Sequence, residues 1–225
     1  MTRGAHALIL ADGSVGPLAT IDDAWPGWSE GIDLVVAADG GARHAAALGR
    51  RLDLWVGDGD SLGDAALGEL AAAGVPIRRL PVDKDESDTE VAVLAAIDAG
   101  ASRLTVLGAL GGARFDHGLA NIWLLAHPRL DGRDVRLIDG SSRIRLIGPG
   151  RSEIRGRIGD LVSLLPFGGD AADVTTTGLT YALRAERLAF GPSRGLSNVR
   201  AAEDASIELR TGRILVAETP ATLPR

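Results

Sequence analysis

The stretch Trp55–Ser61 reads WVGDGDS, a short apolar run that passes into two glycines and two carboxylates. The apolar run and the glycines predict a buried strand that breaks into a turn. Asp58 and Asp60 then stand at the carboxyl end of that strand, the edge where open α/β sheets bind ligands. Because residues two apart in an extended segment project to the same side, both carboxylates can face one hard cation such as Mg²⁺. The alternative is a turn in which both aspartates only accept hydrogen bonds from nearby backbone amides.

The amino-acid composition limits which class of protein this chain can belong to. The 225 residues suffice for one large domain or two small ones, and an apolar fraction of 45% is typical of a globular chain. A net charge of -6 without a long basic run argues against a nucleic-acid partner. The lack of cysteine excludes disulfides, thiolate catalysis and cysteine-based zinc sites. No apolar run is long enough to span a bilayer and no signal pattern opens the sequence, so we expect no membrane partner and a cytoplasmic location.

Apolar segments alternate with helical segments through the first part of the chain. This alternation predicts an α/β domain with a mostly parallel sheet and flanking helices. The predicted strands are His6–Leu10, Leu34–Ala38, Leu54–Val56, Ile77–Leu80, Arg103–Leu107, Val135–Asp139 and Arg143–Ile147. The alternation stops near Gly148, after which short β-type segments separated by turns predict a smaller all-β sandwich. We therefore expect one domain at residues 1–149 and a second at residues 150–225.

Five aspartates should gather on one rim of the first domain, since each follows a predicted strand or starts a helix. They are Asp39, Asp58, Asp60, Asp88 and Asp116. Like charges on one rim repel each other unless a cation neutralises them, and Mg²⁺ bridging to phosphate oxygens would do so. Glycine-rich turns at Gly40–Gly41 and Gly111–Gly112 expose amides suited to phosphate, and Lys84 and Arg114 can add positive charge. Asp88 is also predicted to cap the helix that follows it.

The standard nucleotide-binding loop motifs are missing from this sequence. The segment after the first strand contains no G-x-G-x-x-G and the chain contains no G-x-x-x-x-G-K-[ST], so a nucleotide would bind in another way. No Ser-His-Asp grouping is evident in the sequence either. A metal-dependent phosphoryl-type transfer therefore fits better than hydrolysis by a nucleophile triad.

Five motifs occur in order along the chain. They are ADGGA at Ala38–Ala42, VGDGDS at Val56–Ser61, KDESDTE at Lys84–Glu90, GALGGARFDH at Gly108–His117 followed by Asn121, and GLSN at Gly195–Asn198. Together these motifs resemble the thiamine pyrophosphokinase (thiamine diphosphokinase) family. The segments GDLVSLLPFGG at Gly159–Gly169 and TTTGLTYAL at Thr175–Leu183 are similar to bacterial members as well. The resemblance thus covers nearly the whole chain.

The resemblance implies a homodimer in which each chain has an α/β catalytic domain and a β-sandwich domain, with active sites between the subunits. It implies that ATP gives its β,γ-pyrophosphoryl group to the hydroxyethyl oxygen of thiamine and that AMP leaves. By motif position, the Mg²⁺ ligands would be Asp58, Asp60 and Asp88, with Asp39 nearby. The triphosphate would be surrounded by Lys84, Asp85, Arg114 and Asp116. The residues in contact with thiamine would be Ser197 and Asn198.

Several points stay open at this level. The proton of the substrate alcohol could pass to Asp88 or to Asp116. Gly59 stands where the family usually has an aromatic residue, which removes a packing ring from the turn, and Ala113 lengthens the glycine-rich loop by one residue. A pterin pyrophosphokinase of related architecture and a noncatalytic nucleotide-binding module are the alternatives. The GLSN motif favours thiamine over a pterin, and five retained aspartates argue against an idle module.

Overall fold

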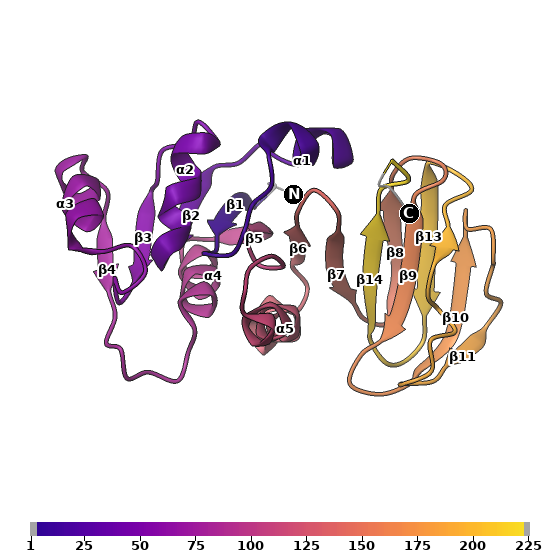
Figure 1. Ribbon diagram of the computed structural model, residues 1–225. Helices are drawn as coiled ribbons and strands as arrows, with labels where there is room; N and C mark the ends of the chain where they lie inside the picture. The colour runs from indigo at the N-terminus through magenta and orange to yellow at the C-terminus, as the bar shows by residue number, and fades with distance from the viewer. Residues whose placement is uncertain (1–3, 223–225) are drawn as a thin grey trace. The chain divides into compact units, whose positions relative to one another are not determined.

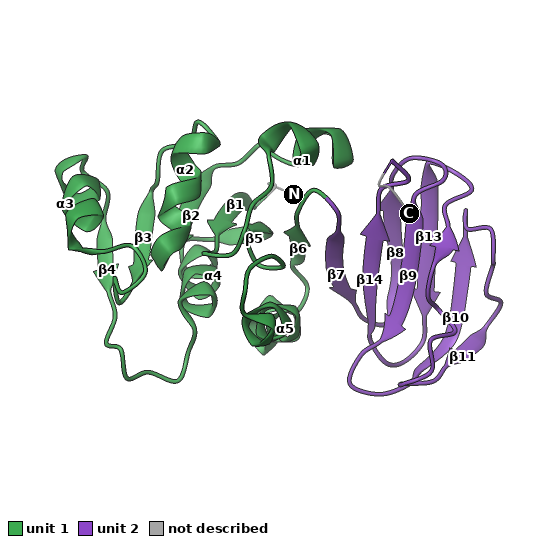
Figure 2. Cartoon of the chain, in the orientation of Figure 1, with its two compact units in different colours: residues 1–140 green, residues 141–225 purple. Residues whose placement is uncertain are grey.

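The computed structural model describes residues 4–222 and divides into two compact units, one ending at Gly140 and the other starting at Ser141 (Figures 1 and 2). The boundary expected from the sequence lies nine residues later, since Arg143–Ile147 reads as a strand of the first domain. In the structure this segment is β7 (Arg143–Ile147), which pairs antiparallel with β14 (Ile214–Thr219) in the second unit. Within residues 4–222, no helix combines the length and the apolar character needed to cross a membrane.

The first unit is built on parallel strands in the order β6-β5-β1-β2-β3-β4. The strands are β1 (Ala5–Leu10), β2 (Leu34–Ala38), β3 (Leu54–Gly57), β4 (Ile77–Arg79), β5 (Ala101–Leu107) and β6 (Asp134–Ile138). The chain runs from β1 out to β4 and then crosses back to β5 on the other side of β1. The strand order therefore reverses between β1 and β5, and a crevice at such a switch point is where open α/β sheets bind ligands.

Helices cover both faces of this sheet (Figure 1). They are α1 (Leu18–Ala24), α2 (Arg43–Ala47), α3 (Asp64–Ala72), α4 (Asp88–Asp98) and α5 (Phe115–Leu124), with 3-10 turns η1 (Asp39–Ala42) and η2 (Pro128–Leu130). In β1, Leu8 and Leu10 belong to an apolar cluster that includes buried residues of α1, α2 and α3. The alternate residues Ala7 and Ile9 face the opposite side, as the pleat requires, and α4 packs against β1, β2, β3 and β5.

The second unit is a β-sandwich of two antiparallel layers, β12-β9-β14-β7 and β11-β10-β13-β8. Its remaining strands are β8 (Gly150–Arg155), β9 (Leu161–Pro166), β10 (Ala171–Thr177), β11 (Glu186–Leu188), β12 (Asn198–Val199) and β13 (Asp204–Leu209). Alternate residues such as Val162 in β9 and Ile207 in β13 are buried in one apolar core to which both layers contribute side chains. The predicted fold class, an α/β unit followed by a smaller all-β sandwich, is confirmed.

A buried ion network lies within the second unit. Glu218 of β14 is 2% exposed, and it accepts hydrogen bonds from Arg143 Nε (2.7 Å) and Nη2 (2.8 Å) and from Arg200 Nη2 (2.7 Å). Burial by itself raises the pKa of Glu218, but the hydrogen bonds and charges of Arg143, Arg145 and Arg200 outweigh burial and leave the pKa below its usual range. The carboxylate therefore stays ionised inside the sandwich.

Candidate active site

A cleft of about 730 Å³ opens at the carboxyl ends of the strands of the first unit. Its walls come from the loops after β1, β2, β3 and β5 and from the first turns of α4 and α5. The loops after β1 and β5 are joined by a hydrogen bond from the Gly13 N–H to Gly108 O (3.0 Å). Only glycine fits at position 13, because a Cβ there would lie 2.1 Å from Gly111 O. The cleft thus forms at the switch point of the sheet.

Three of the predicted aspartates converge in this cleft. Carboxylate oxygens of Asp39, Asp58 and Asp60 lie within 4.8 Å of one another. Asp39 is buried and has a φ of 40°, and its carboxylate accepts hydrogen bonds from the backbone N–H groups of Ser61 (3.1 Å) and Leu62 (3.3 Å). These bonds fix the loop after β3 to the end of β2, so the two strand ends present their acids to the same space.

The electrostatics of this acid cluster are unfavourable without a cation. Burial raises the pKa of Asp39 to about 6, and its contact with Asp60 adds to the rise. The hydrogen bond with Asp39 lowers the pKa of Asp60, and the bond from Ser61 Oγ (3.1 Å) contributes. Such splitting is expected where two carboxylates share one site. The donors are all carboxylate oxygens, the ligands that Mg²⁺ prefers, so the cluster fits a hard divalent ion.

The turn between Asp58 and Asp60 uses the glycine that separates them. Gly59 has a φ of 88°, and a Cβ there would lie 2.7 Å from Leu67 Cδ1 of α3. Leu67 therefore fills the space beside the turn where the family resemblance suggests an aromatic ring. The Asp60 N–H also donates to Asp58 Oδ1 (3.0 Å). The hydrogen-bonded turn proposed as an alternative does exist, and it coexists with the convergence of the acids.

Asp88 is the first residue of α4, but it does not cap the helix. Ser87 is the N-cap, and its Oγ accepts from the Glu90 N–H (3.1 Å). The predicted capping role of Asp88 was therefore wrong, because the residue before it supplies the cap. The Asp88 carboxylate instead lies 3.2 Å from Lys84 Nζ, and the burial of Asp88 raises its pKa despite this neighbour.

Lys84 links Asp88 to the acid cluster. Its Nζ lies 3.7 Å from Asp58 Oδ2, and its side chain is only 12% exposed. Asp88 itself is outside the group of three acids whose oxygens lie within 4.8 Å. Asp85, also predicted at the triphosphate, is exposed and does not line the cleft.

Arg114 and Asp116 stand together at another wall of the cleft. Arg114 donates to both carboxylate oxygens of Asp116, at 2.9 and 2.6 Å. This pairing lowers the pKa of Asp116 to about 2 and raises the pKa of Arg114. Both side chains are exposed, so the pair is open to a ligand in the cleft.

Two cleft residues received no predicted role from the sequence. Asp12 follows β1 in the segment ADG, and Arg43 Nη1 donates to its Oδ1 (2.7 Å). The same strand, acid and glycine pattern that pointed to Asp39 could have identified Asp12. Asn121 is buried in α5 and its Nδ2 donates to Ala109 O (2.9 Å), which fixes the glycine-rich loop.

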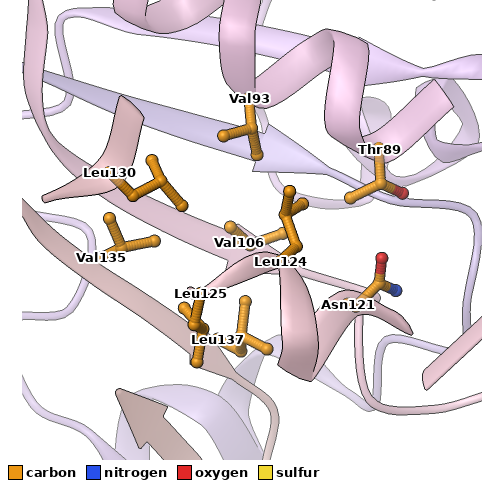
Figure 3. A pocket seen from close by; sticks show the side chains of 9 residues that line it. All are labelled: Thr89, Val93, Val106, Asn121, Leu124, Leu125, Leu130, Val135 and Leu137. Atoms are coloured by element: carbon orange, nitrogen blue, oxygen red, sulfur yellow. The ribbon is translucent and has the colours of Figure 1, made fainter. Parts of the chain in front are cut away.

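A small apolar cavity adjoins the cleft between α4, α5 and the sheet (Figure 3). Thr89 and Asn121 line both spaces, and the rest of the cavity wall is formed by valine and leucine side chains. Its volume of about 10 Å³ is at the lower limit for a single water molecule. It is therefore a packing gap in the core, and the cleft is the candidate substrate site.

Ser197 and Asn198 lie in the second unit, at the start of β12. Ser197 has a φ of 58° and its N–H donates to Ser163 Oγ (3.0 Å). Asn198 Oδ1 accepts from the N–H groups of Tyr181 (3.0 Å) and Val199 (2.9 Å), and its Nδ2 donates to Tyr181 O (2.7 Å). Asn198 thus fixes the backbone of Tyr181, whose side chain is exposed.

Two family models match the chain. Residues 28–137 match the model "Thiamin pyrophosphokinase, catalytic domain", and residues 151–214 match "Thiamin pyrophosphokinase, vitamin B1 binding domain". Together they cover more than half of the 225 residues. The chain belongs to the thiamin pyrophosphokinase family. The recognition of this enzyme family from the sequence motifs is confirmed.

Relatives of the thiamin pyrophosphokinase family resemble the chain in sequence and in structure. A curated thiamine pyrophosphokinase of Bacillus subtilis (strain 168) is 29% identical over 143 residues, which span 63% of this chain and 66% of that protein. A crystal structure of thiamine pyrophosphokinase from Bacillus subtilis has a TM-score of 0.81 at 23% identity, covering 95% of this chain and 98% of the other. A thiamin pyrophosphokinase family protein from Enterococcus faecalis has a TM-score of 0.80 at 27% identity, covering 96% and 99%.

The family models divide the candidate residues between them. The match to the thiamin pyrophosphokinase catalytic-domain model contains the acids from Asp39 to Asp116. The match to the vitamin B1 binding model contains Ser197 and Asn198. The residues drawn from the two sets of sequence motifs thus fall in the two different units of the fold.

Proposed function

We propose that this chain transfers the β,γ-pyrophosphoryl group of ATP to the hydroxyethyl oxygen of thiamine, giving thiamine diphosphate and AMP. The observation that carries the proposal is the convergence of Asp39, Asp58 and Asp60 in a cleft at the switch point of the α/β unit. Apart from Ala11, Asp12 and Gly13, the residues that line this cleft lie within the part of the chain that matches a thiamin pyrophosphokinase catalytic domain.

The acid cluster would hold Mg²⁺. Asp58 and Asp60 are the proposed ligands from the strand end, and Asp39 joins them because its oxygens share the same space. Asp88 is the fourth proposed ligand, and it approaches the cluster only through Lys84. When bound, the ion would neutralise negative charge on the phosphate oxygens of ATP.

The remaining cleft residues would position the triphosphate. Amides of the glycine-rich loop at Gly111–Gly112, together with Lys84 and Arg114, face the cleft and suit phosphate oxygens. Positioning of two substrates can lower a barrier by about 7 to 11 kcal/mol. Asp116 holds Arg114 in a bidentate pair, and a carboxylate with a pKa of about 2 is a weak proton acceptor. We therefore assign Asp116 to the orientation of Arg114, which leaves Asp88 as the candidate base.

The second unit would supply the thiamine pocket through Ser197 and Asn198. The contacts of Asn198 support an indirect role, since its amide group holds the backbone of Tyr181. The exposed ring of Tyr181 then offers an aromatic surface to a heterocycle. A homodimer with each site shared between two subunits, and a cytoplasmic location, remain part of the proposal on the strength of the family resemblance.

Turnover tests the reaction directly. The full-length protein is incubated with ATP, Mg²⁺ and thiamine, and nucleotides and thiamine esters are separated by chromatography. AMP and thiamine diphosphate formed in equal amounts, and only when thiamine is present, are the expected products. ADP would indicate ordinary kinase chemistry, pterin-dependent AMP would indicate a pterin pyrophosphokinase, and no turnover would indicate a noncatalytic module.

Mixing of two impaired variants tests the shared site. If one site joins the first unit of one chain to the second unit of another, co-refolded Asp58→Asn and Asn198→Ala chains form one intact site per mixed dimer. Activity at limiting thiamine then exceeds that of either variant alone. Sites contained in single chains would show no such recovery.

A further inference from the structure

Lys84 is the only lysine in the chain, although Lys and Arg together number 24. It lies between β4 and α4, and its side chain is 12% exposed. Arginine presents a planar fork that binds two oxygens at once, whereas lysine carries a compact ammonium on a flexible stem. A lysine at this position, in a chain whose other basic residues are arginines, therefore provides a small positive charge that can move.

The ammonium of Lys84 lies between acids from two separate elements. Its Nζ is 3.7 Å from Asp58 Oδ2 and 3.2 Å from Asp88 Oδ1, and it donates to Pro81 O (3.4 Å). Among residues 4–222, no group donates a hydrogen bond to the buried Asp88 Oδ1. The contact between Lys84 and Asp88 is therefore an ion pair without a well-directed hydrogen bond.

Asp58 belongs to two arrangements at once. Its carboxylate faces Lys84, and it is also one of the three acids whose oxygens lie within 4.8 Å. A positive charge held this close to the acid cluster repels a second cation, and the repulsion is strong because the Asp58 and Lys84 side chains are largely shielded from water.

We propose that Lys84 acts as an internal cation of the cleft when no ligand is bound. Its ammonium joins Asp58 to Asp88 and weakens the binding of a free divalent ion. The ammonium turns to the polyphosphate when metal and nucleotide bind together. The step involving polyphosphate rests on the proposed function. Because polyphosphate gives the ammonium a new anionic partner and frees Asp58, metal and polyphosphate favour each other's binding. The cleft would then select the metal complex of its nucleotide over the metal alone.

Metal binding without nucleotide tests the first part of the proposal, that Lys84 weakens the binding of a free divalent ion. Mn²⁺ is titrated into the metal-free full chain, and binding is followed by electron paramagnetic resonance of the free ion. Lys84→Met is expected to bind Mn²⁺ about tenfold or more tightly than the wild type, the size of effect that a charge 4–6 Å away has on an ionisation equilibrium. An affinity equal to or weaker than that of the wild type overturns the proposal.

A matched control separates this effect from a general change in charge. Arg114→Met also removes one positive charge from the cleft, but its partner is Asp116 and not Asp58. We expect its Mn²⁺ affinity to stay within about twofold of the wild type, since the charge of the exposed Arg114 is screened by water and salt. An equal gain in both variants overturns the specific role of Lys84. Circular dichroism checks folding, and Lys84→Gln replaces Lys84→Met if the latter does not fold.

The single lysine allows a second readout that needs no substitution. An amine-reactive reagent labels the wild-type chain, and peptide mapping separates the Lys84 product from the amino-terminal product. Labelling of Lys84 should be slow without metal, faster in saturating Mg²⁺, and slow again when inorganic triphosphate is added. An unchanged or lower rate in Mg²⁺ alone overturns the proposal. If both tests succeed and thiamine-dependent turnover fails, only the proposed function is lost.

Discussion

The two units place buried or half-buried carboxylates in opposite settings. In the cleft of the first unit, the single ammonium of Lys84 pairs with Asp58 and Asp88, and the pKa values of Asp39 and Asp88 are raised, primarily by burial. In the second unit, Glu218 is surrounded by arginines and its pKa is lowered. The excess of acid in the cleft supports the proposed metal site, whereas the chain itself neutralises Glu218 in the second unit.

The largest effect should follow from the loss of one acid in the cleft. We expect Asp58→Asn to lower turnover by about a thousandfold, corresponding to about 4 kcal/mol, because one ligand of the proposed metal is lost. The free energy of unfolding should not fall, since the variant removes a charge from a repelling cluster. Steady-state AMP formation and urea unfolding measure the two quantities.

Asp64→Asn is the matched control for this prediction. Asp64 begins α3, its side chain is 85% exposed, and it pairs with Arg79 outside the cleft. The control should retain turnover within about twofold, as expected for an exposed ion pair. An Asp58→Asn enzyme as active as this control would remove Asp58 from the chemistry.

Breaking the ion network of the second unit should lower stability instead. Glu218→Gln leaves the fully buried Arg200 without its carboxylate partner, so we expect a loss of about 3–5 kcal/mol in the free energy of unfolding. Asp204→Asn breaks the exposed pair with Arg155 and should change stability by less than about 1 kcal/mol. Equal losses in the free energy of unfolding, measured with urea, would show that the buried network stabilises the protein no more than the exposed pair does.

A smaller effect is expected at Asn198. Replacement by alanine removes three hydrogen bonds and leaves the backbone of Tyr181 unfixed, a penalty of about 1–3 kcal/mol. We expect the KM for thiamine to rise about tenfold while the KM for ATP stays constant. Asn198→Asp keeps the acceptor but loses the bond to Tyr181 O, and should give an intermediate KM. An unchanged KM for thiamine in both variants would contradict the role of Asn198.

The sequence predicts the position of each acid better than the geometry of the group. The apolar strands that precede Asp39 and Asp58 correctly indicate the rim of a parallel sheet. The closeness of Asp39 to Asp58 and Asp60 depends on the left-handed backbone at Asp39 and on its bonds to the loop after β3. Such contacts between distant segments leave no trace in local hydrophobic periodicity.

Details of the first turn of α4 and of Asn198 also depend on geometry that the sequence does not show. Ser87 and Asp88 are both good capping residues, and only the geometry of the first turn shows that Ser87 is the cap. The motif at Asn198 predicts a contact with thiamine, and the structure adds that its amide group is bonded to the backbone of Tyr181, 17 residues earlier in the chain. A motif identifies which residues matter, but a side chain can act through a neighbour that the spacing does not reveal.

The pH dependence of stability should show the smallest effect and can be read at Glu218. The pKa of Glu218 is lowered in the folded chain by its arginine partners, relative to about 4.3 in an unfolded chain. A carboxyl with a lowered folded pKa stabilises the protein above the unfolded pKa and loses this contribution as the pH falls through the folded pKa. The difference in unfolding free energy between wild type and Glu218→Gln should therefore be constant above about pH 5 and shrink below about pH 4. Urea unfolding at several pH values measures this difference. A difference that widens on acidification would mean that Glu218 is protonated in the folded chain. The contrast between Glu218 and the acids of the cleft would then be wrong.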